Sequence, residues 1–132
     1  MQFIPPEALP YFENMIYLPM IIKILERDRG EIEIGSFKLK KPYVEIIEGS
    51  LKIAKNDMKQ ATVYLKRNNM KVVKNLNDGT FTEYLFLYKG YEDHRKYLNI
   101  RLRNRTEELM TIYFEKGMLD NGRASEENIR LH

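Results

Sequence analysis

The chain has 132 residues, of which 43% are hydrophobic and 31% charged, with a formal net charge of +3 and no cysteine. This length forms one domain with a core of its own. The lack of cysteine excludes disulfides, thiolate zinc sites and cysteine nucleophiles, and it suits a reducing cytosol. The uncharged apolar stretch 14–22 is too short to span a bilayer and follows no basic leader. We therefore expect a cytoplasmic protein without a membrane partner.

The N-terminal part predicts a proline-rich arm followed by a helix. Three prolines within residues 1–10 disfavour helix, so this segment is expected to be an extended arm. From Tyr11 the apolar residues follow helical spacing, and the helix can continue to about Ile34. Pro19 lacks a backbone donor and clashes with the preceding turn, so a kink or a break is expected there.

A seven-residue apolar repeat predicts a long second helix from about Pro42 to Asn68. Pro42 suits a first helical turn, and Asn68 suits a helix C-terminus. The spacings of four and three residues define one amphipathic stripe, which is typical of a packed helical bundle. The stripe consists of Tyr43, Ile47, Leu51, Ala54, Met58, Ala61 and Leu65.

The next segment is predicted to be a connection and a third helix. The valine-rich residues 70–74 could be extended, but one lone strand cannot form a sheet. We therefore expect a loop that ends in the turn at residues 77–79, with a helix capped at Thr80. Residues Tyr84–Tyr88 are apolar or aromatic throughout, which is typical of a central helix. That helix is expected to last to about residue 94 or 97.

Two starts remain open for the last helix. Asn104 begins a capping-box pattern, and Asn99 is a competing start. In either case the helix runs to about Lys116 and is expected to end at Gly117. Residues 118–132 are polar and short of core residues, so they are predicted to be a flexible polar tail.

Together these elements predict an all-α fold. The expected architecture is an antiparallel bundle of three to four helices, with a proline-rich N-terminal arm and a flexible C-terminal tail. The bundle is expected to be a single domain over residues 1–117, followed by the tail at 118–132.

Charge is spread unevenly along the chain. Residues 38–74 carry ten basic and three acidic side chains, whereas residues 1–37 and 106–132 each carry more acidic than basic ones. Packing of the basic helix beside the acidic segments is the simpler interpretation, and a surface for an anionic partner is the alternative. The possible nucleic-acid or anion contacts are Lys52, Lys55, Lys59 and Lys66 on one flank of the second helix, with Arg101, Arg103 and Arg105 near the last helix.

No catalytic residue, cofactor or metal site is predicted. Helical bundles with di-iron sites use Glu-x-x-His pairs, and this chain contains none. It also has no Gly-x-Ser-x-Gly elbow and no glycine loop of the phosphate-binding kind. His94 follows Glu92 and Asp93, which would suit an acid/base or a weak divalent-ion role, but a surface or capping role is the simpler interpretation.

Four stretches of the sequence carry a family resemblance: IYLPM at 16–20, FKLKKPY at 37–43, FLYKGYE at 86–92 and IRLRNRTEELM at 100–110. In these stretches the chain resembles the Bacillus YhjD-like family of small proteins of spore-forming Firmicutes. The resemblance spans about residues 10–117 and leaves out the tail. It implies a bacterial cytosolic protein of the same size, and it brings no activity, cofactor or site residue.

The expected function is that of a non-enzymatic interaction or regulatory protein that binds a protein partner or a second copy of itself. The complete apolar stripe and the aromatic content motivate this, because apolar surface that short helices cannot hide favours association. Nucleic-acid binding through the basic residues is the alternative, and it predicts a steep salt dependence. An enzyme that uses His94 as acid or base is the third possibility.

Overall fold

The computed structural model describes residues 4–131, with side chains over residues 4–119. A 3-10 turn (Pro6–Ala8) leads into α1 (Leu9–Ile34) and α2 (Lys40–Arg67), and α3 (Asn99–Leu131) comes last. Between α2 and α3 lie three strands, β1 (Met70–Asn77), β2 (Phe81–Tyr88) and β3 (Tyr91–Leu98). The fold is therefore α+β, and the prediction of an all-α bundle of three to four helices is wrong.

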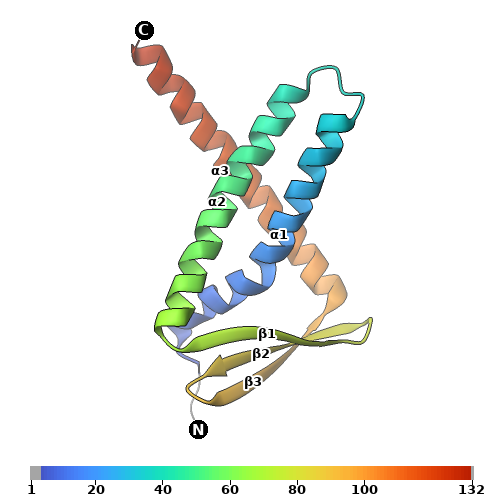
Figure 1. Ribbon diagram of the computed structural model, residues 1–132, viewed down its shortest axis with the longest axis vertical. Helices are drawn as coiled ribbons and strands as arrows, with labels where there is room; N and C mark the ends of the chain where they lie inside the picture. Colours follow the sequence, from blue (N-terminus) through green and yellow to red (C-terminus); the bar gives the residue numbers. More distant parts are fainter. Residues whose placement is uncertain (1–3, 132) are drawn as a thin grey trace.

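The strands form an antiparallel meander in the order β1-β2-β3 at one end of the helices (Figure 1). A two-residue turn joins β2 to β3, since Tyr88 pairs with Tyr91. Lys89 and Gly90 both have positive φ, 48° and 81°, as such hairpin turns require. The wider turn from β1 to β2 is held by Asp78, whose Oδ1 accepts hydrogen bonds from the backbone N–H groups of Thr80 and Phe81. These bonds hold the pKa of Asp78 below its usual value.

The predicted third helix at residues 80–97 is replaced by β2 and β3, and the predicted loop at 70–74 is part of β1. The run Tyr84–Tyr88 is apolar on both faces of a strand rather than all round a helix. Tyr84 and Phe86 are buried, whereas Leu85 and Leu87 are only partly covered on the opposite face. The segment 70–74 is not a lone strand because β2 pairs with it along its length.

The first two helices follow the sequence prediction closely. Residues 4–8 of the arm lead into and form the 3-10 turn rather than an extended chain, and Ala8 is fully buried. Pro19 lies inside α1, and the ribbon of α1 bends in its first half, as a mid-helix proline predicts (Figure 1). In α2 the predicted apolar stripe faces the interior, except that Tyr43 remains half exposed.

The C-terminal helix begins at the alternative start, Asn99, and not at Asn104. The Asn99 side chain accepts a hydrogen bond from Thr82 Oγ1 at 2.6 Å and donates one to Asn77 Oδ1 at 3.0 Å, so it joins the helix to the sheet. Gly117 does not end the helix. Most side chains of the predicted tail at 118–132 lie outside the described residues, since side chains are described only to residue 119. The flexibility of this tail stays a prediction.

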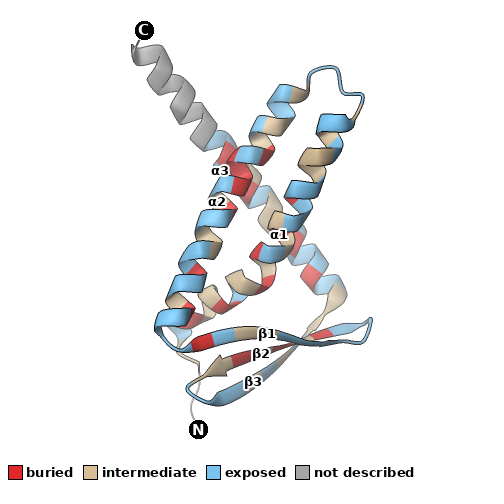
Figure 2. Cartoon of the chain, in the orientation of Figure 1, coloured by how far each residue is buried: buried red, intermediate tan, exposed pale blue. Residues whose placement is uncertain are grey.

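Two buried clusters hold the helices and the sheet together (Figure 2). In the first, Phe12 of α1 stacks on Phe86 of β2 with ring centroids 4.6 Å apart, and both side chains are fully buried. The second joins the three helices around Leu18, Ile21 and Leu25 of α1. No helix in the described part of the chain has a stretch long and apolar enough to cross a membrane.

Helices α2 and α3 cross at a point of very close approach. A Cβ added to Gly117 of α3 would lie 2.8 Å from the backbone nitrogen of Ser50 and 2.8 Å from its hydroxyl oxygen. Nearby, the Tyr113 hydroxyl of α3 donates a hydrogen bond of 2.6 Å to Asp57 of α2. Burial of the phenol and this bond raise the pKa of Tyr113, so the hydroxyl remains a donor over the whole neutral range.

We expect Gly117→Ala to lower the free energy of unfolding by about 1–3 kcal/mol, because the methyl group meets backbone that cannot turn aside. The matched control is Gly30→Ala in α1, where an added Cβ meets no atom within 4 Å. That change should stabilise the protein by about 0.5–1 kcal/mol through helix propensity. Urea unfolding of both variants checks this, and equal stability of the two would contradict the close crossing.

Candidate functional site

A groove runs along α1 where this helix faces β1 and the start of α3. It consists of three hollows of about 310, 300 and 310 Å³. The first two share Met15 and Val72, and the last two share Met20, Lys74 and Tyr84. Because neighbouring hollows share lining residues, they lie side by side in a row, which we call the α1–β1 groove.

The floor of the α1–β1 groove is apolar and rich in methionine. Met15 and Met20 lie five residues apart on α1, and Met70 and Val72 lie two residues apart on one face of β1. Tyr84 comes from the centre of β2, with its ring edge-on to another tyrosine of the sheet. Methionine side chains are flexible and polarisable, so such a floor can adapt to apolar groups of different shape.

The rim of the groove is basic. Five cations and no carboxylate belong to the lining of the three hollows: Lys23, Lys66, Lys71, Lys74 and Arg103. Within the described residues, none of the five makes a side-chain hydrogen bond or an ion pair. Unpaired cations around an apolar floor are available to an anionic ligand, since no internal carboxylate competes for them.

The threonine hydroxyls in the groove are engaged within the protein. Thr82 Oγ1 donates to Asn99 at 2.6 Å, and Thr106 Oγ1 donates to the carbonyl oxygen of Leu102 at 2.7 Å. Thr62 Oγ1 likewise donates to a backbone carbonyl of its own helix at 2.9 Å. The lining contains no histidine and no carboxylate that could serve as general acid or base.

The structure separates the basic residues that the sequence placed together. Lys66 and Arg103 line the groove. Lys55 instead pairs with Glu26 of α1 at 2.9 Å, and Arg105 pairs with Glu108 at 2.9 Å. Lys59 lines a different hollow, of about 350 Å³, between the second half of α2 and Tyr11 of α1.

The remaining two candidates, Lys52 and Arg101, are exposed away from the groove-lining residues. Because residues 101–105 are helical, Arg101 and Arg105 share one side of α3 and Arg103 points to another. The sequence did not indicate Lys23, Lys71 and Lys74, which line the same row of hollows as Lys66 and Arg103. The available signal is the pair of valines between Lys71 and Lys74, which suits a strand, whereas the sequence analysis predicts a loop there.

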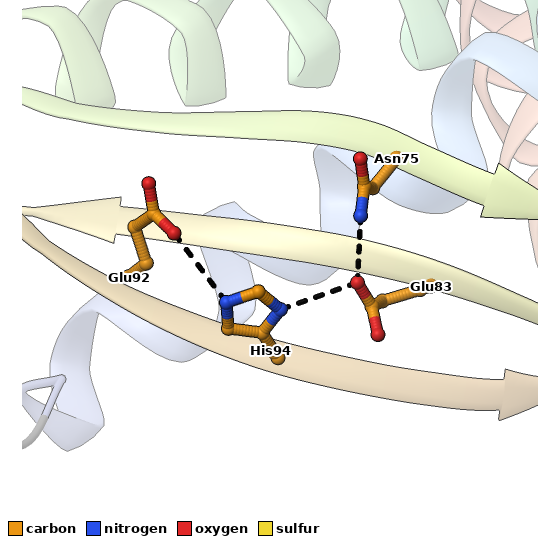
Figure 3. A network of polar contacts seen from close by, with 4 residues as sticks. All are labelled: Asn75, Glu83, Glu92 and His94. Atoms are coloured by element: carbon orange, nitrogen blue, oxygen red, sulfur yellow. Dashed lines mark hydrogen bonds and ion pairs between the residues drawn. The ribbon is translucent and has the colours of Figure 1, made fainter.

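His94 lies on β3, on the face of the sheet away from α1, and 53% of its side chain is exposed. Its Nδ1 is 3.2 Å from Glu83 Oε1, and its Nε2 is 3.4 Å from Glu92 Oε2 (Figure 3). Asn75 donates a further hydrogen bond of 2.7 Å to Glu83 Oε1. The hydrogen bond to Glu83 is the main cause that raises the pKa of His94, and Asn75 and His94 together lower the pKa of Glu83.

This surface network is a cross-strand arrangement and is separate from the groove. No described residue with acid, base or nucleophile chemistry converges on His94 from the helices, since its two partners are on the same sheet. Over residues 4–119, no three histidine, aspartate or glutamate side chains form a group that could hold a metal ion.

Comparisons with known proteins identify the family. The model of the family described as "YhjD protein" matches residues 3–118. The "Uncharacterized protein YhjD" of Bacillus subtilis (strain 168) is 37% identical over 107 residues, which is 81% of this chain and 89% of that protein. No solved structure matches the chain. The family resemblance predicted from the four short stretches is thus confirmed.

We expect the His94 imidazole to keep its proton to a higher pH than an unperturbed histidine, whose pKa is about 6.5. Glu83→Gln should lower the pKa of His94 because it removes the main hydrogen-bond partner, and Glu92→Gln should lower it less. An NMR titration of the imidazole protons measures both, with His94→Gln to separate the signal of His132.

The raised pKa of His94 makes the stability of the folded protein depend on pH in one direction. Because the folded-state pKa of His94 is raised, its stabilising contribution is present below the unfolded pKa and is lost as pH rises through the folded pKa. A pKa for His94 that does not change in Glu83→Gln would contradict the network.

Proposed function

The chain belongs to the YhjD family, and we propose that it acts as a non-enzymatic interaction protein that receives an acidic, apolar segment of a partner protein in the α1–β1 groove. One observation carries the proposal: five unpaired cations surround a methionine-rich apolar floor, and no carboxylate lies among them. We also propose a cytoplasmic location, which the lack of cysteine supports.

The chemistry of the groove favours an amphipathic helix as the ligand. Such a helix presents apolar side chains on one face, which fit an adaptable methionine floor, and acidic side chains beside them, which fit the basic rim. Charge complementarity of this kind raises the association rate and selects against basic partners. Lys23 and Lys74 stand on elements that face each other across the groove, so both flanks of a bound helix would meet a cation.

Nucleic-acid binding remains the second proposal, with less support from the geometry. It relied on the lysine flank of α2 together with three arginines, and two of those seven residues have carboxylate partners. Its best remaining feature is the hollow beside Lys59 and Arg67, where Tyr64 stacks on Tyr11 with centroids 3.9 Å apart. Both rings are occupied with each other, so a base would have to compete for their faces.

Self-association also remains a proposal, but the apolar stripe of α2 no longer argues for it. Leu51, Ala54 and Ala61 are buried within one chain, in the packing of α2 on its neighbours. A second copy would have to use surfaces other than this stripe, and light scattering at several concentrations would detect it.

We expect an amphipathic helical peptide with leucines on one face and glutamates on the other to bind in the groove. The NMR signals of the methionine methyl groups show where the peptide binds. Met15, Met20 and Met70 line the groove, whereas Met58 and Met110 pack against the buried cluster that joins the three helices. The first three signals should shift during the titration, and the other two should stay in place.

The double variant Lys74→Glu with Arg103→Glu should bind this peptide roughly tenfold more weakly, which is about 1.4 kcal/mol. Lys52→Glu with Arg101→Glu is the matched control, since both residues are exposed outside the groove. Equal loss in both double variants, or shifts at Met58 and Met110, would overturn the groove assignment. Tighter binding of a single-stranded oligonucleotide at Lys59 would favour the second proposal instead.

A further inference from the structure

The loop that joins α1 to α2 carries a second surface, which is independent of the groove. It lies at the end of the helical pair opposite the sheet and projects from the molecule (Figure 1). Most of the loop is exposed (Figure 2), and four large apolar or aromatic side chains are exposed on it and on the adjoining helix ends. The exposed fractions are 83% for Ile34, 50% for Phe37, 72% for Leu39 and 53% for Tyr43.

Lysines alternate with these apolar side chains. Residues 36–43 contain Lys38, Lys40 and Lys41 and no acidic residue. Lys40 Nζ donates to the carbonyl oxygen of Glu33 at 2.8 Å, a bond that leaves its charge uncompensated. Lys41 lies 3.8 Å from Glu45 with 87% of its side chain exposed, so water screens this pair. In the described part of the chain Lys38 has no ion pair and no side-chain hydrogen bond.

The aromatic residues of the loop support each other. The rings of Phe37 and Tyr43 lie with centroids 5.8 Å apart and planes inclined by 51°. The pair bridges the loop and the first turn of α2, so Phe37 and Leu39 are presented on an ordered loop rather than on a free chain. An ordered apolar tip loses less conformational entropy when it is covered.

From these features we propose that the loop 34–43 docks on the surface of an anionic lipid bilayer. Exposed leucine and aromatic side chains partition into the headgroup boundary of a bilayer, and lysines between them contact anionic headgroups. The charge of the loop argues for a bilayer that carries negative charge. The expectation of no membrane partner depends on the absence of a spanning segment, and a loop that lies in the interface needs none.

The acidic residues nearby limit the contact to the tip. Glu31 and Glu33 are exposed on the last turn of α1, directly before the loop. Anionic headgroups repel these carboxylates, so the remainder of α1 and of α2 stays in water and only residues 34–43 enter the interface.

A single tryptophan reports this contact, because the chain has none of its own. Leu39→Trp should give a blue-shifted emission when vesicles of equal parts phosphatidylglycerol and phosphatidylcholine are added, and little shift with phosphatidylcholine alone. Leu76→Trp is the matched control, since Leu76 is 63% exposed on β1, and its emission should not change. Both positions are open enough to accept tryptophan in the folded protein.

Two further variants test the two parts of the surface in a vesicle sedimentation assay. Lys38→Glu with Lys41→Glu should weaken binding at least tenfold, and Phe37→Ser with Leu39→Ser should abolish it. The proposal falls if Leu39→Trp shows no shift, if Leu76→Trp shifts equally, or if the charge reversal leaves binding unchanged. If the loop docks on an acidic protein instead, the emission of Leu39→Trp should not shift when vesicles are added. None of these residues lines the α1–β1 groove, so failure here leaves the groove proposal untouched.

Discussion

The stacked contact between Phe12 and Phe86 holds the two halves of the fold together. A three-stranded sheet cannot stay folded in water unless one apolar face is covered. α1 covers this face, and the two fully buried rings, 4.6 Å apart, form the centre of the contact. Without it the groove would lose one wall, because the groove exists only where α1 lies over β1 and β2.

α1 carries two apolar faces in succession, and Pro19 stands where one gives way to the other. Phe12 and Ile16 belong to the cluster on the sheet, whereas Leu18 and Ile21 belong to the cluster among the helices. Ile16 and Leu18 are two residues apart and therefore lie on nearly opposite sides of the helix, so the two halves of α1 contact different neighbours. The bend that accompanies Pro19 helps the first half of α1 to pack on the sheet and the second half to pack on α2 and α3. Pro19 itself lines the groove beside Met20.

The excess positive charge of residues 38–74 is distributed over two separate surfaces by the fold. The lysines at its beginning lie on the α1–α2 loop, and those at its end lie on β1 and the last turn of α2, at the opposite end of the helical pair (Figure 1). Between them Lys55 is neutralised by Glu26 across the two helices. The complementary packing predicted from the charge pattern is therefore correct for the pair Lys55–Glu26.

Periodicity in the sequence was enough to predict the elements whose hydrogen bonds are local. The stripe of α2, the extent of α1 and the alternative start of α3 at Asn99 were all visible, because helical hydrogen bonds close within four residues. The predicted cations included Lys66 and Arg103, but no local pattern joins them to Lys23 and Lys74. That residues 70–98 form a sheet became clear only in three dimensions, since a strand is stable only through its pairing partners, and Tyr84–Tyr88 fits either period. The groove depends on the same contacts: its walls come from α1, α2, the sheet and α3, and no local pattern records which segments meet.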